Sequence, residues 1–296
     1  MRAKPQPPHR NLPASAATLR RMHDHEHDDL EHDRGLDHDL PRLINRRKAI
    51  AVMAGSLGAG FLAACGSSDG EGGTATTSQA SPGATASADA TSIPEETAGP
   101  FPGDGSNGPN VLAESGVVRQ DITKSFGDAS GVAEGVPTTI EMTLLDVAGG
   151  GGPFAGAAVY AWHCDREGRY SLYDGEIAGE NYLRGVQESD DAGKVRFTTI
   201  FPAAYQGRWP HVHFEVYESL EAATQGATKL RTSQLAIPQE TCEAVYATEG
   251  YEQSVANLAG TSLEGDMVFA DGYASQLAKA EGSVEEGYTL TLNVGV

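Results

Sequence analysis

The amino-acid sequence predicts a mainly β fold, an antiparallel β-sandwich with few short helices. Two observations lead to this prediction. Hydrophobic and polar residues alternate with a period of two in five separate segments, a pattern typical of strands with one buried face. Residues that favour turns separate these segments, as at 149–153 and 190–193, which is the spacing of a sandwich. The glycine run at 149–152 is not followed by lysine and serine or threonine, so the chain shows no phosphate-binding loop.

The alternating segments follow one another from residue 139 to the C-terminus. In this pattern one face of each strand packs into a core and the other face meets polar surroundings. One helix is expected from about Gln239 to Thr248, because Pro238 lies near its start and Gly250 follows its end. The predicted strands are residues 139–144, 157–161, 195–199, 212–216 and 288–294.

The first 65 residues differ in character from the rest of the chain. Residues 1–45 are polar and rich in histidine, and Met22 is a second candidate for the start of translation. Arg46-Arg47-Lys48 then precedes an apolar run, residues 49–64. A basic region, a short apolar region and small residues indicate an export signal, and the paired arginines favour the twin-arginine route. The apolar run is shorter than the about 20 residues that span a membrane.

The apolar run ends at Leu62-Ala63-Ala64-Cys65, which resembles a bacterial lipobox. This resemblance implies that Cys65 is lipidated and that the mature chain is exported, extracytoplasmic and anchored to the outer face of the cell membrane. A plain signal peptide and an uncleaved anchor are the alternatives. Residues 66–93 are rich in Gly, Ser, Thr and Ala, as in a flexible linker. We therefore divide the chain into an N-terminal extension and signal (1–65), a linker (66–93) and a catalytic domain (94–296).

Charge and cysteine content restrict the partners of the predicted domain. The whole chain has a formal net charge of −20, and residues 66–296 hold 11 Lys and Arg against 33 Asp and Glu. Such a surface repels nucleic acid and anionic lipid, so no nucleic acid is expected and the membrane is reached only through Cys65. Cys164 and Cys242 form an even pair, which favours a disulfide in an oxidising compartment.

The most informative segment for chemistry is Arg208-Trp209-Pro210-His211-Val212-His213. His211 and His213 share one face of a strand about 7 Å apart, so both imidazoles can reach one metal ion. Taken alone, such a pair of histidines on a strand is weak evidence, because it more often has a structural role than a metal-binding one. Tyr205 and Arg208 lie close by, and tyrosine is a rare ligand that suits a hard ferric ion.

Together with other motifs, this segment resembles the intradiol ring-cleavage dioxygenases, the family of catechol 1,2- and protocatechuate 3,4-dioxygenases. The resemblance covers roughly residues 94–245 and implies the β-sandwich of that family. The motifs are residues 96–102 (ETAGPFP), 118–122 (VRQDI), 156–163 (GAAVYAWH), 168–171 (GRYS), 181–185 (NYLRG), 201–205 (FPAAY), 208–213 (RWPHVH) and 232–234 (TSQ).

In that family, Fe(3+) is held by two tyrosinates, two histidines and a hydroxide. The resemblance assigns the two tyrosinates to Tyr170 and Tyr205 and the two imidazoles to His211 and His213. Phenolate is a hard anion that stabilises the ferric state, and two phenolates with hydroxide balance a trivalent charge in a buried site. Tyr182 is the rival for the first tyrosine, and we interpret it, like Tyr173, as a pocket or core residue.

The resemblance implies an enzyme that cleaves the ring of a small-molecule catechol with O₂ to a cis,cis-muconate-type product. In this role Tyr205 leaves the iron and acts as a base, Arg208 stabilises developing negative charge, and Gln234 lies near the same centre. A structural ion pair is the alternative for Arg208, and a sheet-edge position is the alternative for Gln234. His163 is expected in the core or behind a ligand. The alternative function is a non-catalytic extracytoplasmic lipoprotein that binds aromatics or metal. The catechol and the oligomeric state stay open.

Overall fold

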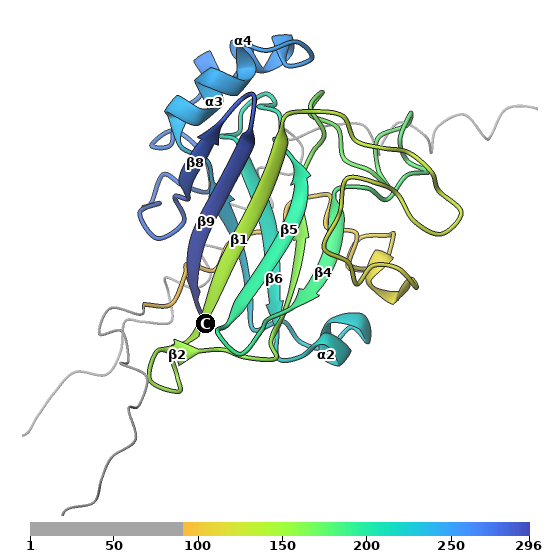
Figure 1. Ribbon diagram of the computed structural model, residues 1–296, viewed down its shortest axis with the longest axis vertical. Coiled ribbons are helices and arrows are strands. Elements are labelled where there is room, and N and C mark those ends of the chain that lie inside the picture. The colour runs from red at the N-terminus through yellow and green to blue at the C-terminus, as the bar shows by residue number, and fades with distance from the viewer. Residues whose placement is uncertain (1–90) are drawn as a thin grey trace, which may run out of the picture. The chain divides into compact units, whose positions relative to one another are not determined.

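The computed structural model describes residues 91–296, in which two β-sheets pack face to face (Figure 1). The five-stranded sheet has the order β2-β1-β9-β8, with β5 also paired to β1, and the four-stranded sheet has the order β4-β3-β6-β7. The strands are β1 (Pro137–Asp146), β2 (Gly152–Pro153), β3 (Ala158–Trp162), β4 (Arg184–Glu188), β5 (Lys194–Ile200), β6 (His211–Tyr217), β7 (Arg231–Ala236), β8 (Lys279–Ser283) and β9 (Gly287–Gly295).

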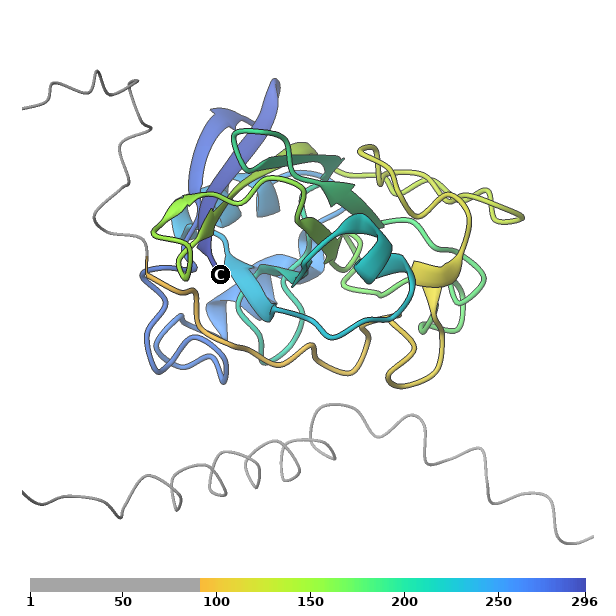
Figure 2. The same cartoon turned by 90° about the horizontal axis from the view of Figure 1, so that it is seen from below.

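Short helices lie around the sheets rather than between them (Figures 1 and 2). They are the 3-10 turn η1 (Val111–Ala113) and the α-helices α2 (Leu220–Thr224), α3 (Gln239–Tyr246) and α4 (Glu252–Ala259). The α3 helix fulfils the prediction from Pro238 and Gly250, although it ends two residues earlier. The mainly β fold with few short helices is confirmed.

One strand pair departs from the predicted antiparallel arrangement. All pairings in the four-stranded sheet are antiparallel, whereas β1 and β9 run parallel from Thr138↔Tyr288 to Leu145↔Gly295. A parallel pair needs a long crossover, and here the chain between the two strands supplies it. The last strand therefore lies inside the sheet, between β1 and β8.

The apolar faces of the alternating strands meet between the two sheets. Burying one such aliphatic or aromatic side chain stabilises the fold by about 1.5–3 kcal/mol. The predicted alternation is thus the physical origin of the sandwich. The inward-facing residues include Ile140, Met142 and Leu144 of β1, Val195 and Phe197 of β5, Leu290, Leu292 and Val294 of β9, and Val159, Ala161, Val212, Phe214, Val216 and Leu235 of the four-stranded sheet.

The outer face of the four-stranded sheet is polar and aromatic, yet it is also buried. Residues opposite one another in the register form a row across it, Arg184–Trp162–His213–Gln234, and each is at most 3 % exposed. The segment 97–104 covers this face, because Gln234 donates to the Thr97 carbonyl (2.9 Å) and Arg184 donates to the Phe101 carbonyl (3.0 Å). We call residues 97–104 the strap. Under it, the sheet provides a dry surface for polar side chains.

Several expectations concern the N-terminal part of the chain. The signal, Cys65 and residues 66–90 of the linker lie outside the described residues. Ile93, the last residue of the predicted linker, is buried and donates its N–H to the Gly295 carbonyl (2.9 Å). Within residues 91–296, no helix has the length and apolarity to cross a membrane.

The expected disulfide is wrong. Cys164 and Cys242 are both free and buried, and they belong to different hydrophobic clusters. The Cys164 thiol donates to the Ala203 carbonyl (3.6 Å). Burial raises the pKa of both thiols, so neither one is present as a reactive thiolate at neutral pH. An even cysteine count does not show that two positions are close enough to be bridged.

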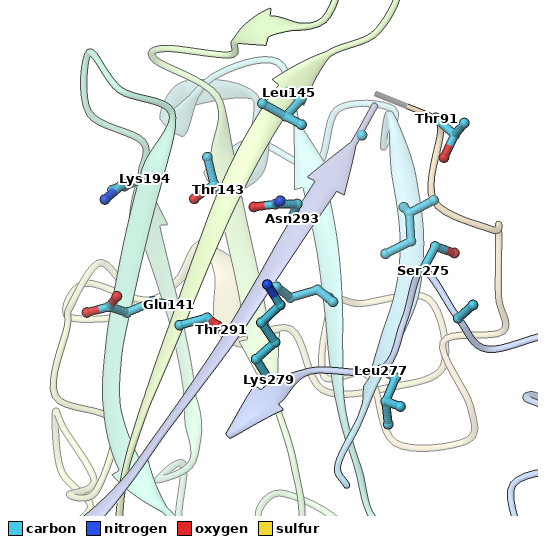
Figure 3. Close-up of a pocket in the computed structure, with 14 residues that line it drawn as sticks. Thr91, Glu141, Thr143, Leu145, Lys194, Ser275, Leu277, Lys279, Thr291 and Asn293 are labelled. Atoms are coloured by element: carbon cyan, nitrogen blue, oxygen red, sulfur yellow. The ribbon is translucent and has the colours of Figure 1, made fainter. Parts of the chain in front are cut away.

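A groove of about 450 Å³ lies on the outward face of the five-stranded sheet (Figure 3). Glu141 and Thr143 of β1 and Thr291 and Asn293 of β9 line it. Its walls contain no tyrosine or histidine, and β1 and β9 belong to the other sheet from β6. This groove is therefore separate from the predicted metal ligands.

Candidate metal centre

Four side chains predicted to bind metal converge from three segments of the chain. His211 and His213 are on β6, Tyr205 is in the loop between β5 and β6, and Tyr170 is in the loop between β3 and β4. Both histidines project from the outer face of the sheet, because Val212 between them points into the core. The strand thus fixes two donors, and two loops bring the phenols to them.

The four donor atoms follow one another at short distances. The Tyr170 and Tyr205 hydroxyl oxygens are 3.4 Å apart, and the Tyr205 oxygen is 3.1 Å from His211 Nε2. His211 Nε2 is in turn 3.0 Å from His213 Nε2. Three of the four residues are buried, while Tyr205 is partly exposed. The cluster is therefore closed on most sides and open at Tyr205.

The environment of each imidazole determines which nitrogen faces the cluster. His211 Nδ1 contacts the Trp209 carbonyl oxygen, so Nδ1 carries the proton and Nε2 keeps its lone pair. The His213 ring stacks on Trp162, with centroids 4.9 Å apart and planes 6° apart. His213 Nδ1 is buried without a hydrogen-bond partner in the described residues. A polar acceptor thus orients His211, whereas an aromatic ring orients His213.

The loop that carries Tyr170 is shaped by a buried carboxylate and a glycine. Asp165 accepts hydrogen bonds from the Glu167 and Arg169 backbone N–H groups (3.0 and 2.9 Å). Gly168 has φ +86°, and a Cβ at this position would lie 3.2 Å from the Tyr205 Cβ. Glycine is needed here both for the left-handed backbone and for the close approach to Tyr205. This is the physical reason for the Gly-x-Tyr spacing.

Burial shifts all four donors toward their neutral forms. It raises the pKa of Tyr170 and Tyr205, although Arg208 acts in the opposite direction on both phenols. It lowers the pKa of His211 and His213, and Arg208 lowers them further. At neutral pH the metal-free cluster therefore holds two neutral phenols and two neutral imidazoles. Only a strongly attracting cation would convert these phenols to phenolates.

Arg208 lies beside the cluster, where the sequence predicts it. Its Nη1 is 3.4 Å from His211 Nε2, and its Nη2 donates to Gln234 Oε1 (2.6 Å). Its Nε donates to the Asp266 carboxylate (2.9 Å), and both partners of this ion pair are nearly inaccessible to water. Burial alone would lower the pKa of Arg208, but Tyr205 and Asp266 raise it. A permanent positive charge is thus held next to the donor atoms.

Gln234 is completely buried on β7, the edge strand of the four-stranded sheet. It accepts from Arg208 and donates to the Thr97 carbonyl of the strap. It touches the cluster through Arg208. Its role is therefore to connect the arginine to the strap.

The other candidate residues lie apart from the four donors. Tyr182 packs in a separate apolar cluster with Ile177 and Leu183. The Tyr173 hydroxyl accepts from the Gly103 N–H and donates to Asn107 (2.8 Å each). His163 is buried with both ring nitrogens occupied, by Thr199 Oγ1 (2.7 Å) and the Cys164 carbonyl (2.8 Å). Burial lowers the pKa of His163 to about 4.

Sequence reasoning missed Asp266. This residue is 58 positions from Arg208 and lies in the irregular segment between α4 and β8. It follows no recognisable motif, and one aspartate among 33 acidic residues of the predicted mature chain carries no signal by itself. Only the folded chain shows that its carboxylate meets the arginine.

The donor set fits a hard, highly charged cation such as ferric iron. Residues 91–296 contain no group of three or more His, Cys, Asp or Glu that could hold a metal, which argues against the usual zinc shells. The cluster instead combines two imidazole lone pairs with two phenols. Two phenolates would neutralise most of a trivalent charge in a buried place, where an unbalanced charge is costly.

Comparisons with known proteins agree with the fold and the motifs. Residues 107–231 match the family model described as Dioxygenase. The chain is similar to an intradiol ring-cleavage dioxygenase from Tetranychus urticae at 22% identity and a TM-score of 0.54, over 69% of this chain and 94% of that chain. A second crystal structure, described as a dioxygenase, matches at 22% identity and a TM-score of 0.55, over 70% of this chain and 94% of the other.

Proposed function

We propose that this chain is an intradiol ring-cleavage dioxygenase, a non-haem Fe(III) enzyme. The match of residues 107–231 to a dioxygenase family model and the similarity in fold support this proposal. The enzyme would open the ring of a catechol with O₂ and yield a cis,cis-muconate-type product. The observation that carries this proposal is the convergence of two phenol oxygens and two imidazole nitrogens beside one buried arginine. Capture of an aromatic molecule alone would need neither the four donors nor the charge.

Tyr170, Tyr205, His211 and His213 would hold the iron. Bound there, ferric iron would bind both oxygens of a catechol and make the ring reactive toward O₂. The protein supplies the surroundings for this chemistry. His211 is held by the Trp209 carbonyl and His213 by the Trp162 ring, so neither imidazole needs to reorganise on metal binding.

Tyr205 is suited to move a proton. It is the partly exposed member of the cluster, so it borders the side from which a substrate approaches. Burial raises the pKa of its phenol, while Arg208 opposes this rise. A phenolate oxygen with this raised affinity for protons is a strong base, and it can accept a proton from a catechol hydroxyl once released from a metal. Tyr170, which is fully enclosed, would stay in place.

Arg208 would stabilise negative charge on the substrate. Its guanidinium is buried and paired with Asp266 and Gln234, so its orientation is fixed before the substrate arrives. A charge fixed in a place without water stabilises a developing anion far better than a mobile surface charge does.

A metal and activity measurement tests the proposal. We expect the purified chain to bind iron, to absorb visible light through tyrosinate-to-iron charge transfer, and to consume O₂ when catechol is added. The Y170F variant should lose most of the absorbance and iron, since one ligand oxygen is removed. The control Y173F removes a hydroxyl that bonds to Gly103 and Asn107, and it should keep both. A colourless wild-type chain that binds zinc instead of iron would refute the proposal.

The alternative is an extracytoplasmic lipoprotein that binds aromatics or metal without turnover. The same experiment separates the two functions, because a binding protein would hold iron or catechol and consume no O₂. Oxygen uptake measured over a panel of catechol, protocatechuate and hydroxyquinol would then identify the preferred substrate.

We further propose that the chain is exported and anchored through a lipid on Cys65. The support is the sequence Arg46-Arg47-Lys48, the apolar run after it and Leu62-Ala63-Ala64-Cys65. Labelling of cells with a radioactive fatty acid should mark the wild-type chain and not the C65S variant. Equal labelling of both chains, or of neither, would refute the anchor.

A further inference from the structure

The strongest unassigned feature is the carboxylate of Asp266. It is completely buried and lies in the segment between α4 and β8, outside residues 107–231 that match the family model. A buried carboxylate is costly unless its oxygens are hydrogen-bonded or paired with a cation. Its partners therefore indicate what it does.

The two oxygens of Asp266 have different partners. Oδ2 accepts hydrogen bonds from Arg208 Nε (2.9 Å) and the Trp209 N–H (2.7 Å). Oδ1 accepts from the Val268 and Phe269 N–H groups (2.8 and 3.3 Å). One oxygen thus binds Arg208 and Trp209, which precede β6. The other binds the backbone of the segment that carries Asp266.

The segment itself is fixed by apolar packing. Val268 and Phe269 are buried in a cluster with Trp209 and Ala236, and Trp209 Nε1 donates to the Ile237 carbonyl (2.8 Å). The carboxylate therefore cannot swing away from Arg208 without opening this cluster. Its position is set before any substrate or metal arrives.

Two fixed points determine the orientation of a planar guanidinium. In Arg208 these points are Nε on Asp266 and Nη2 on Gln234 (2.9 and 2.6 Å). The remaining nitrogen, Nη1, then faces His211 Nε2 at 3.4 Å. Without Asp266 the side chain would keep a single anchor and could rotate away from the donor cluster.

We propose that Asp266 is a positioning residue that fixes the Arg208 guanidinium toward the donor cluster. The segment between α4 and β8 thereby completes a centre whose other residues come from the motifs between 168 and 234. This inference rests on the proposed function for its kinetic test, while its structural test needs no activity. Asp266 touches none of the four donor atoms in the described hydrogen bonds. It also accepts from the Trp209 N–H, so the test must separate a route through Arg208 from a route through Trp209.

A double-mutant cycle tests the inference with iron-loaded full chain. In D266N the single amide oxygen cannot accept on both sides, and we expect kcat for ring cleavage to fall by about 10–100-fold. Iron content and visible absorbance should stay near the wild-type values. In the R208M background, D266N should change kcat by less than about 2-fold, because its effect passes through Arg208. The control E264Q alters an exposed carboxylate of the same segment that binds Tyr273, and it should match wild type.

If the fold-losses in kcat from D266N and R208M multiply in the double variant, the inference is overturned, because Asp266 would then act without Arg208. Loss of iron in D266N would overturn it too, because the aspartate would then support the donors themselves.

A second measurement does not depend on activity, and it uses a variant only to assign a signal. The Nε–H proton of Arg208 can be followed by NMR in the metal-free wild-type full chain, with R208K to assign the signal. We expect it to exchange with solvent at least about 100-fold more slowly than that of Arg196, whose side chain is 54% exposed. Equal exchange rates would overturn the inference. Slow exchange together with no O₂ uptake by the iron-loaded chain would refute the proposed function and keep the positioning role.

Discussion

Arg184 and Arg208 are both buried on the outer side of the four-stranded sheet, yet their surroundings differ. Arg184 donates to five oxygens, at distances from 2.9 to 3.2 Å, on Phe101, Pro102, Tyr160 and Ser171. Arg208 instead has one carboxylate, one amide oxygen and a long contact to an imidazole nitrogen. Both arginine side chains are buried, so the difference lies in the groups that accept their hydrogen bonds.

Arg184 is fully engaged by its acceptors, whereas Arg208 directs one guanidinium nitrogen at a candidate metal ligand. The hydrogen-bonding capacity of Arg184 is used by backbone and hydroxyl oxygens, which tie the strap to the loop at Ser171. Around Arg208, lone pairs of two imidazoles and two phenols face one another at 3.0–3.4 Å. Polar groups packed in this way favour a cation between them. A satisfied network gives rigidity, whereas an incomplete one marks a site.

The strap connects the two regions. Its Phe101 and Pro102 carbonyls accept from Arg184, while its Thr97 carbonyl accepts from Gln234. Between them, a Cβ on Gly99 would lie 3.3 Å from the His213 ring. The strap therefore passes so close to the His213 ring that a side chain at Gly99 would crowd it.

The largest effect is expected from breaking the Arg184 network. The R184M variant removes one donor from each of five oxygens, of which the Pro102 carbonyl keeps the Tyr160 hydroxyl. This should lower the free energy of unfolding by about 3–5 kcal/mol. Denaturation with urea would measure it. The control R196M breaks an exposed pair with Glu141 and should cost at most about 1 kcal/mol. Equal losses in the two variants would contradict the structural role of Arg184.

The next effect concerns the pH dependence of metal binding in the Arg208 region. Burial raises the pKa of Tyr170 and Tyr205 and lowers the pKa of His211 and His213. Near neutral pH the phenols must lose two protons on binding, and the histidines lose none. The affinity for the metal should therefore rise by about 100-fold per pH unit.

Competition with a chelator between pH 6 and 8, corrected for hydrolysis of free ferric ion, would measure this slope. The Y170F variant releases one proton fewer when it binds the metal. Its affinity should therefore rise by only about 10-fold per pH unit. An affinity that does not change with pH would show that the phenols are not ligands.

The smallest effect tests the contact between the two tyrosine loops. Alanine at Gly168 (φ +86°) meets both backbone strain and the Tyr205 Cβ, whereas alanine at Gly127 (φ +67°) meets no atom within 4 Å. Both G168A and G127A should lose about 1–2 kcal/mol of stability from strain. Only G168A should also weaken the iron-dependent absorbance, as visible spectra would show. Equal spectra for the two variants would indicate that the Tyr205 loop adapts freely.

Strand prediction succeeded where the pattern was strong and local. The five alternating segments correspond to β1, β3, β5, β6 and β9. Four further strands, β2, β4, β7 and β8, were not predicted. The β4 strand begins with Arg184, which is polar and fully buried, and β8 is short with an internal glycine. Their pairing partners, not their own periodicity, make them strands.

The sequence alone was sufficient to predict the sandwich, the resemblance to the intradiol dioxygenases and the candidate donors Tyr170, Tyr205, His211 and His213. These follow from alternation and motifs, which short stretches of chain express. Tertiary structure decided that β1 and β9 run parallel, that Cys164 and Cys242 stay apart and that Asp266 reaches Arg208. The physical reason is distance along the chain. Burial and hydrogen bonding between segments dozens of residues apart depend on how the whole chain packs, and local pattern does not contain that information.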